Sequence, residues 1–201
     1  MKYLKMLGIA AVAAMSFMAF AAASASATTL EVEGVTQNKT VFITASLTPG
    51  NSAVLSRTDG SLANTCTESH VEGHTIAPFT VPTTGEITGT VETLSFTGCT
   101  RPVTVHKPGL LHISHETGTT NGTVTSSEAE VTVGSPFGTL VCKTGTGTHI
   151  GTMTGATTAS NPGKHAEIHI NAVLNCGFLV PSAKWSGTYI VTTPTELGVS
   201  A

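Results

Sequence analysis

The amino-acid sequence predicts an all-β protein, an antiparallel β-sandwich or two packed Greek-key halves, stapled by disulfides. The chain is rich in Thr, Gly and Val, and only 10% of its residues are charged, a composition that suits pleated strands better than helix or disorder. Short alternating runs recur with turn residues about every 8–12 positions, the spacing of a sandwich or barrel. No stretch keeps a helical period over three turns.

The clearest single strand runs from His165 to Cys176. Alternate positions along one face are apolar, while the other face is mostly polar, which predicts a half-buried strand. At roughly 3.3 Å per residue it would extend about 40 Å. Its apolar face ends in a cysteine, so a disulfide can hold this strand in place in addition to its packing against the core.

The N-terminus predicts a secretory signal peptide over residues 1–27. Lys2 and Lys5 precede an apolar run from Met6 to Phe20, and small residues then lead to Ala27, the preferred cleavage position, with Ala25 second. No later run approaches the roughly 20 apolar residues that cross a membrane. We therefore expect a secreted, extracellular protein whose mature form does not span a membrane.

The net charge of the mature chain limits the classes of partner that we expect. Loss of the two leader lysines leaves seven basic and twelve acidic residues, a net charge of −5, with no basic cluster. This distribution argues against nucleic acid and anionic membranes as partners. An extracellular partner is expected, but its chemistry is not indicated.

The remaining strands are predicted from short alternating or β-branched runs bounded by Gly, Pro, Asn or Asp. They are Leu30–Val32, Val41–Leu47, Ala53–Leu55, a strand carrying Cys66, Phe79–Val81, Ile87–Val91, Thr93–Thr97, Val103–His106, Leu110–Ser114, Thr123–Thr125, Ala129–Val133, Leu140–Lys143, His149–Thr154 and Trp185–Thr192. The segment from Glu68 to Gly85, rich in His, Gly, Pro and Thr, is predicted to be a long surface loop around the short strand at Phe79–Val81.

The four cysteines predict two disulfides, because their number is even and all lie beyond the leader. They are Cys66, Cys99, Cys142 and Cys176, and sequence alone allows three pairings. A four-thiolate zinc site is the rival interpretation. It is disfavoured because no two of the cysteines form a C-x2-C or C-x4-C pair.

Cysteine spacing also suggests an internal repeat. Cys66 to Cys99 is a step of 33 and Cys142 to Cys176 a step of 34, and a glycine followed by a strand comes ten or eleven residues later in each case. We interpret residues 28–115 and 116–201 as two β halves that share one core. Each half should then close its own bridge, Cys66–Cys99 and Cys142–Cys176. Coincidental spacing is the alternative.

Three segments, Leu94–Cys99, Phe137–Cys142 and Lys184–Val191, resemble a functionally uncharacterised group of Thr/Gly-rich secreted proteins of soil actinobacteria. The resemblance covers most of the mature chain and lies in structural cysteines and strand aromatics. It implies export from a bacterium and implies no activity.

Histidine is the residue type most suggestive of a functional site, and the chain contains eight histidines. His165, Glu167 and His169 share one face of the long strand, and His70 and His74 flank Glu72 in the predicted loop. Two such H-x-E-x-H clusters could hold a transition metal through imidazole and carboxylate. The favoured interpretation is a solvated strand face and a polar loop, without a cofactor.

Trp185 and Tyr189 lie four residues apart on one face of their strand, with Gly187 between them. Exposed, the two rings would form a platform for a sugar. Buried, they would be core, with Gly187 leaving room for the neighbouring ring, and this second interpretation is preferred.

An enzyme is not expected. Asp59 is the single aspartate and lies in an Asp-Gly turn, no G-x-S-x-G elbow occurs, and the cysteines are expected to be oxidised. The sequence therefore predicts an exported, non-enzymatic structural or interaction module of the cell surface or exterior. A glycan- or metal-binding module is the alternative.

Overall fold

The computed structural model describes residues 28–61, 64–76, 85–135, 138–157, 163–178 and 180–201. The strands in this part are β1 (Thr29–Val32), β2 (Val35–Thr36), β3 (Phe42–Leu47), β4 (Ala53–Arg57), β5 (Asn64–Thr75), β6 (Glu86–Cys99), β7 (Val103–Lys107), β8 (Leu110–His115), β9 (Gly122–Ser127), β10 (Glu130–Ser135), β11 (Gly138–Lys143), β12 (Thr148–Thr154), β13 (Glu167–Leu174), β14 (Ala183–Thr193) and β15 (Leu197–Ser200). The all-β prediction is confirmed. The predicted leader and the predicted strand Phe79–Val81 lie outside the described residues.

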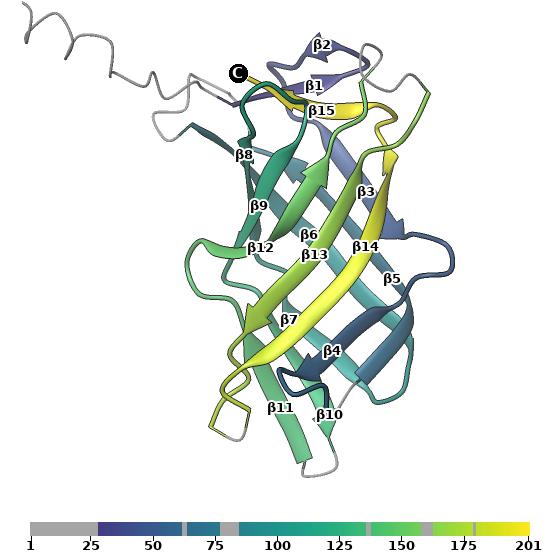
Figure 1. The fold of residues 1–201 in the computed structure, drawn as a ribbon, viewed down its shortest axis with the longest axis vertical. Helices are drawn as coiled ribbons and strands as arrows, with labels where there is room; N and C mark the ends of the chain where they lie inside the picture. The colour runs from purple at the N-terminus through teal and green to yellow at the C-terminus, as the bar shows by residue number, and fades with distance from the viewer. Residues whose placement is uncertain (1–27, 62–63, 77–84, 136–137, 158–162, 179) are drawn as a thin grey trace, which may run out of the picture.

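The largest sheet closes on itself into an eight-stranded barrel, which corrects the predicted sandwich or Greek-key halves (Figure 1). Successive strands pair antiparallel around the ring in the order β3, β5, β6, β8, β9, β12, β13 and β14, and β14 then pairs with β3. β4 continues β3 in the same position, because both pair with β14 on one side and with β5 on the other. A sandwich was predicted because inward and outward alternation is the same in both architectures.

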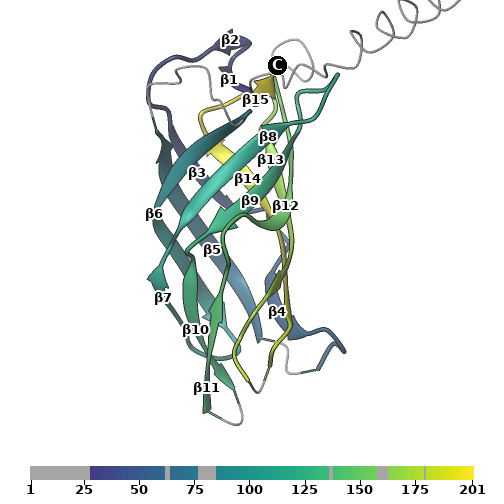
Figure 2. The same cartoon turned by 90° about the vertical axis from the view of Figure 1, so that its left-hand side faces the viewer.

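Two small sheets extend the barrel at its ends. β15, β1 and β2 form a cap at one end, where Leu30, Leu197 and Val199 are almost fully buried (Figure 1). β11, β10 and β7 prolong the wall at the other end, as the turned view in Figure 2 shows. The strand β15 was not predicted from the sequence. No helix in the described part of the chain is long and apolar enough to cross a membrane.

The long strand predicted over 165–176 is β13 with a short extension at each end. Its inward residues from Ala166 to Cys176 are buried or half-buried, while His169, Asn171 and Asn175 are exposed. Alternating burial thus follows the sequence pattern, although Val173, on the outer face, is exposed as well.

The predicted surface loop from Glu68 is wrong for its first part, because β5 continues to Thr75. The inward side chains of this part of β5 include Ser69 and Thr75, both buried, and Gly73 lies between them. Because these residues are small or polar, the hydropathy pattern does not reveal the alternation. Gly73 lies at a register shift against β6, where a Cβ atom would lie 2.3 Å from the Thr90 carbonyl oxygen. Only glycine allows this approach of two backbones.

Both predicted disulfides are present, Cys66–Cys99 and Cys142–Cys176. Cys66 and Cys99 are direct cross-strand partners on β5 and β6. Cys142 on β11 is joined to Cys176, just beyond the bridge between Lys143 and Asn175 that ties β11 to the end of β13. The second bridge therefore fixes the lower sheet to the barrel wall.

Candidate functional site

The interior of the barrel contains three neighbouring apolar cavities. An upper cavity of about 70 Å³ lies under the cap, a middle one of about 60 Å³ follows, and a lower one of about 50 Å³ lies beside the extended wall. Leu197 lines the upper cavity, Val124 and Ile150 the middle one, and Val103 and Val133 the lower one. Protein interiors rarely leave more than a few voids above the size of a water molecule.

Shared walls connect the cavities into one row along the barrel. Ala45, Val71 and Ile168 border both the upper and the middle cavity. Leu94, Ala129 and Trp185 border both the middle and the lower cavity. The three cavities therefore adjoin one another through common lining residues.

An aromatic pair lies beside the lower junction. Trp185 on β14 packs edge-on against Phe96 on β6, with ring centroids 6.0 Å apart and an interplanar angle of 71°. Trp185 is half-buried and faces both neighbouring cavities. It is the single tryptophan of the chain, so its fluorescence reports on this junction alone.

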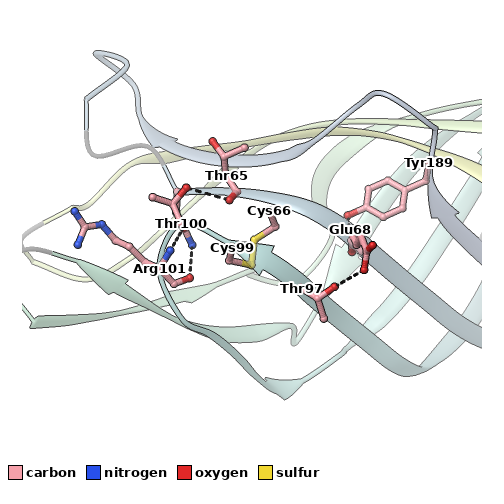
Figure 3. The surroundings of a disulfide bond; sticks show 10 residues. Thr65, Cys66, Glu68, Thr97, Cys99, Thr100, Arg101 and Tyr189 are labelled. Atoms are coloured by element: carbon pink, nitrogen blue, oxygen red, sulfur yellow. Dashed lines mark hydrogen bonds between the residues drawn. A yellow bond between two sulfur atoms is a disulfide. The ribbon is translucent and has the colours of Figure 1, made fainter.

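Polar side chains at the lower end of the barrel have hydrogen-bond or ion-pair partners close by. The buried Asn64 side chain accepts a hydrogen bond of 2.8 Å from the Arg101 amide, and thereby holds the turn between β6 and β7. Figure 3 shows Arg101 near the Cys66–Cys99 bridge. Lys143, which lines the lower cavity, forms an ion pair with Glu130 at 2.9 Å. The hydrogen bond from Lys143 holds the pKa of the Glu130 carboxyl below its usual value. The positive charge of Lys143 at the border of the lower cavity is therefore compensated by the carboxylate of Glu130.

Tyr189 closes a break in the wall of the middle cavity. Its ring is 3% exposed, and its hydroxyl donates a buried hydrogen bond of 3.1 Å to the Ser69 hydroxyl on β5. A Cβ atom at Gly187 would lie 3.4 Å from the Tyr189 ring and 3.5 Å from both Leu47 and Ala53. The ring therefore lies where β3 ends and β4 begins. Burial raises the pKa of Tyr189 to about 12, so the hydroxyl stays protonated at neutral pH.

A polar recess of about 420 Å³ lies on the outer face of the same break. Its lining combines five hydroxyls with a carboxylate, an imidazole and one apolar side chain: Ser46, Thr67, Ser69, Ser95, Thr97, Glu68, His70 and Leu47. The Glu68 carboxylate accepts a hydrogen bond of 2.8 Å from the Thr97 hydroxyl, as Figure 3 shows. Ser69 belongs both to this recess and to the Tyr189 hydrogen bond.

The structure separates the predicted metal clusters into His–Glu pairs. His70 contacts Glu72 at 2.9 Å, whereas His74 contacts Glu92 on β6 at 3.0 Å and packs against Phe42 with the two rings tilted by 49°. No group of three or more His, Cys, Asp or Glu side chains suited to a metal ion occurs among the described residues.

The second predicted cluster lies at the start of β13. His169 lies 3.5 Å from Glu167, and both are substantially exposed. The Nδ1 atom of His165 is buried and has no hydrogen-bond partner in the part of the chain that the structure describes. His165 precedes β13 itself, so it does not join the other two on one regular strand face.

The cavities were not predicted from the sequence. Trp185 and Tyr189 were considered as an exposed sugar platform or as core, and the structure directs both rings into the barrel wall and its interior. Ala45 and Ala129, which leave room at the two junctions, carry no signal that distinguishes them from packed core alanines. Comparison of the chain with protein-family models, curated proteins and solved structures yields no match.

Proposed function

We propose that this protein is an exported, non-enzymatic binding module that holds a slender apolar molecule inside its barrel. The row of three apolar cavities carries this proposal. Eight-stranded barrels are just wide enough to be filled by side chains or to hold one small ligand. In this barrel the side chains leave cavities along the barrel axis. The two disulfides fit an extracellular protein, and export is part of the proposal.

The chemistry of the lining favours an aliphatic chain. The middle cavity is bordered mainly by aliphatic and aromatic side chains, and its two hydroxyls are those of Ser126 and of Tyr189, the latter already bonded to Ser69, so a polar ligand would lose its hydration with few replacement hydrogen bonds. Together the three cavities are comparable to the roughly 150 Å³ apolar cavity known to bind benzene. Their arrangement in a row, with Leu94 and Trp185 lining both the middle and the lower space, suits a chain better than a broad ring system.

Trp185 supplies the test, because it lines two of the cavities and is the single tryptophan. Titration of the mature protein with 1-bromooctane should quench its fluorescence in a saturable manner, since bromine quenches an indole that it contacts. Quenching that rises linearly, as for a free tryptophan derivative, would refute the proposal.

Two matched variants sharpen this test. Ala129→Leu fills the junction of the lower and middle cavities and should weaken 1-bromooctane binding on the order of tenfold or more, about 1.4 kcal/mol. Thr152→Leu places the same side chain at an exposed position of β12 and should leave binding unchanged. Overpacking can cost about 1–3 kcal/mol, so thermal unfolding of both variants must show that they are folded.

A further inference from the structure

The outer recess and the middle cavity are linked through a pair of hydrogen-bonded residues, because Ser69 lines the recess and Tyr189 lines the cavity. Ladder pairing between β3 and β5 ends at Ser46 and His70, and pairing between β4 and β5 resumes at Ala53 and Cys66. The recess lies over this interruption, and the ring of Tyr189 lies under it, with its hydroxyl bonded to Ser69. Tyr189 also lines the middle cavity. A molecule in the recess is therefore one aromatic ring away from the barrel interior.

We propose that this recess binds the polyhydroxylated head group of an amphipathic ligand whose aliphatic chain lies in the barrel. The inference rests on the proposed function, because it assigns the polar half of the same ligand. It adds a second subsite, a ligand class and a lateral route past Tyr189.

The lining of the recess matches a sugar-like group. Hydroxyls of Ser46 and Ser95 can each donate and accept, as sugar hydroxyls do, while the Glu68 carboxylate accepts only. The Thr97 hydroxyl donates to Glu68 and can still accept. His70 contributes an imidazole whose Nε2 lies 2.9 Å from Glu72 and whose Nδ1 lies 3.4 Å from the Ser46 hydroxyl. An anionic head group would meet the negative charges of Glu68 and Glu72, and an apolar one would leave the polar lining without partners.

The volume of the recess and the way in which Tyr189 closes it off from the barrel interior are compatible with this assignment. A volume of about 420 Å³ lies within the roughly 300–1,000 Å³ of small-molecule sites. A single hydrogen bond between neutral hydroxyls holds the Tyr189 ring to β5, and such a bond makes only a small net contribution to stability. Gly187 adds no side chain beside the ring. Displacement of Tyr189 therefore opens the break without breaking a strand ladder.

Three probes separate the subsites: octyl glucoside carries both halves of the ligand, 1-bromooctane the chain alone, and methyl glucoside the head alone. Binding to the mature protein is measured by calorimetry and, for the bromoalkane, by Trp185 quenching. Octyl glucoside, kept below its micelle concentration, should bind on the order of tenfold more tightly than 1-bromooctane. Methyl glucoside should bind weakly and should compete with octyl glucoside.

Paired variants locate the head group. Glu68→Gln combined with His70→Ala should weaken octyl glucoside on the order of tenfold while 1-bromooctane binds as before. Glu167→Gln combined with His169→Ala, an exposed His–Glu pair on β13, is the matched control and should change neither affinity.

The outcomes distinguish this inference from the proposed function. If octyl glucoside and 1-bromooctane bind with equal affinity, or if the recess variant weakens neither, the head-group subsite is refuted while the apolar site stands. If none of the probes binds, the barrel site is refuted and the subsite with it.

Discussion

The buried Tyr189 hydroxyl predicts a stability difference that reverses its sign with pH. The perturbation is Tyr189→Phe, which keeps the ring and removes the hydroxyl that donates to Ser69. At neutral pH the variant should be less stable by about 1 kcal/mol, the net contribution of such a hydrogen bond. The ring still closes the break in the wall, so the fold itself should be unchanged.

Alkaline pH then destabilises the wild type selectively. Burial raises the pKa of Tyr189 from 10.0 to about 12, so between these values the unfolded chain has lost the proton while the native protein keeps it. Because the unfolded state binds fewer protons there, the free energy of unfolding falls as pH rises from 10 to 12. Two pKa units correspond to about 3 kcal/mol, of which roughly 2 kcal/mol is lost by pH 12.

The curves of the two proteins should therefore cross between pH 10 and 12, with Tyr189→Phe the more stable above the crossing. Guanidinium unfolding at a series of pH values measures this, since lysine titration is common to both proteins. Phenolate absorbance gives the pKa directly, because the second of the two tyrosines, Tyr3, lies in the predicted leader. A phenol that titrates near 10 in the folded protein, or a constant gap between the two proteins, would show that Tyr189 is not buried as described.

The remaining predictions concern the bridges, the histidines, the bulge glycine and the leader. Replacing either cysteine pair by alanine should cost roughly 3–4 kcal/mol in urea unfolding, because each bridge closes a loop of about 34 residues; a loss below 1 kcal/mol would contradict this. The triple variant His165→Ser, Glu167→Gln and His169→Ser should change stability by less than about 1 kcal/mol, and metal analysis should find no metal lost from the protein. Gly151→Ala should destabilise by about 1–3 kcal/mol, because its Cβ would lie 2.0 Å from the His169 carbonyl oxygen, whereas Gly60→Ala, in an open turn with positive φ, tests backbone strain alone. N-terminal sequencing of exported protein should begin at Thr28 or Ser26, and a mature chain that keeps Met1 would overturn the compartment.

Strand positions could be predicted where hydropathy alternates. The inward series through Ile170, Ala172 and Leu174 is buried as its pattern indicates. The same reasoning failed for the second half of β5, where Ser69 and Thr75 face inward as small polar residues that use hydrogen bonds to remain buried. Alternation reports the apolar content of a face, and a face of small polar residues escapes it.

Barrel closure and the cavities could not be predicted from local pattern. Closure depends on β14 pairing with both β13 and β3, a property of strand tilt and stagger that no single segment encodes. A cavity arises where side chains from opposite walls fail to meet, so Ala129 and Trp185 acquire their role only together. The candidate site therefore had no signature along the chain.

The repeat stays a prediction, but the ring of strands is consistent with it. Four strand positions fall before residue 116 and four after it, and each half contains one disulfide. Cys66–Cys99 joins the second ring position to the third, whereas Cys142–Cys176 joins β11, outside the ring, to the chain just beyond β13. Register shifts occur at Gly73 on β5 and before Gly151 on β12, the second position in each half.

The closing ladder has a consequence for how the chain reaches its native state. Every other pair of ring neighbours is close in the sequence, with at most two short strands between its members, so those pairings close shorter loops and can form early. The ladder between β14 and β3 joins Val191 to Ala45, from opposite ends of the domain, and must wait until nearly the whole chain is present. Until then β3 and β14 are open edges with unpaired backbone, the state in which β proteins associate wrongly. Slow final closure, with an early phase of local hairpins, is thus the expected kinetic signature of this topology.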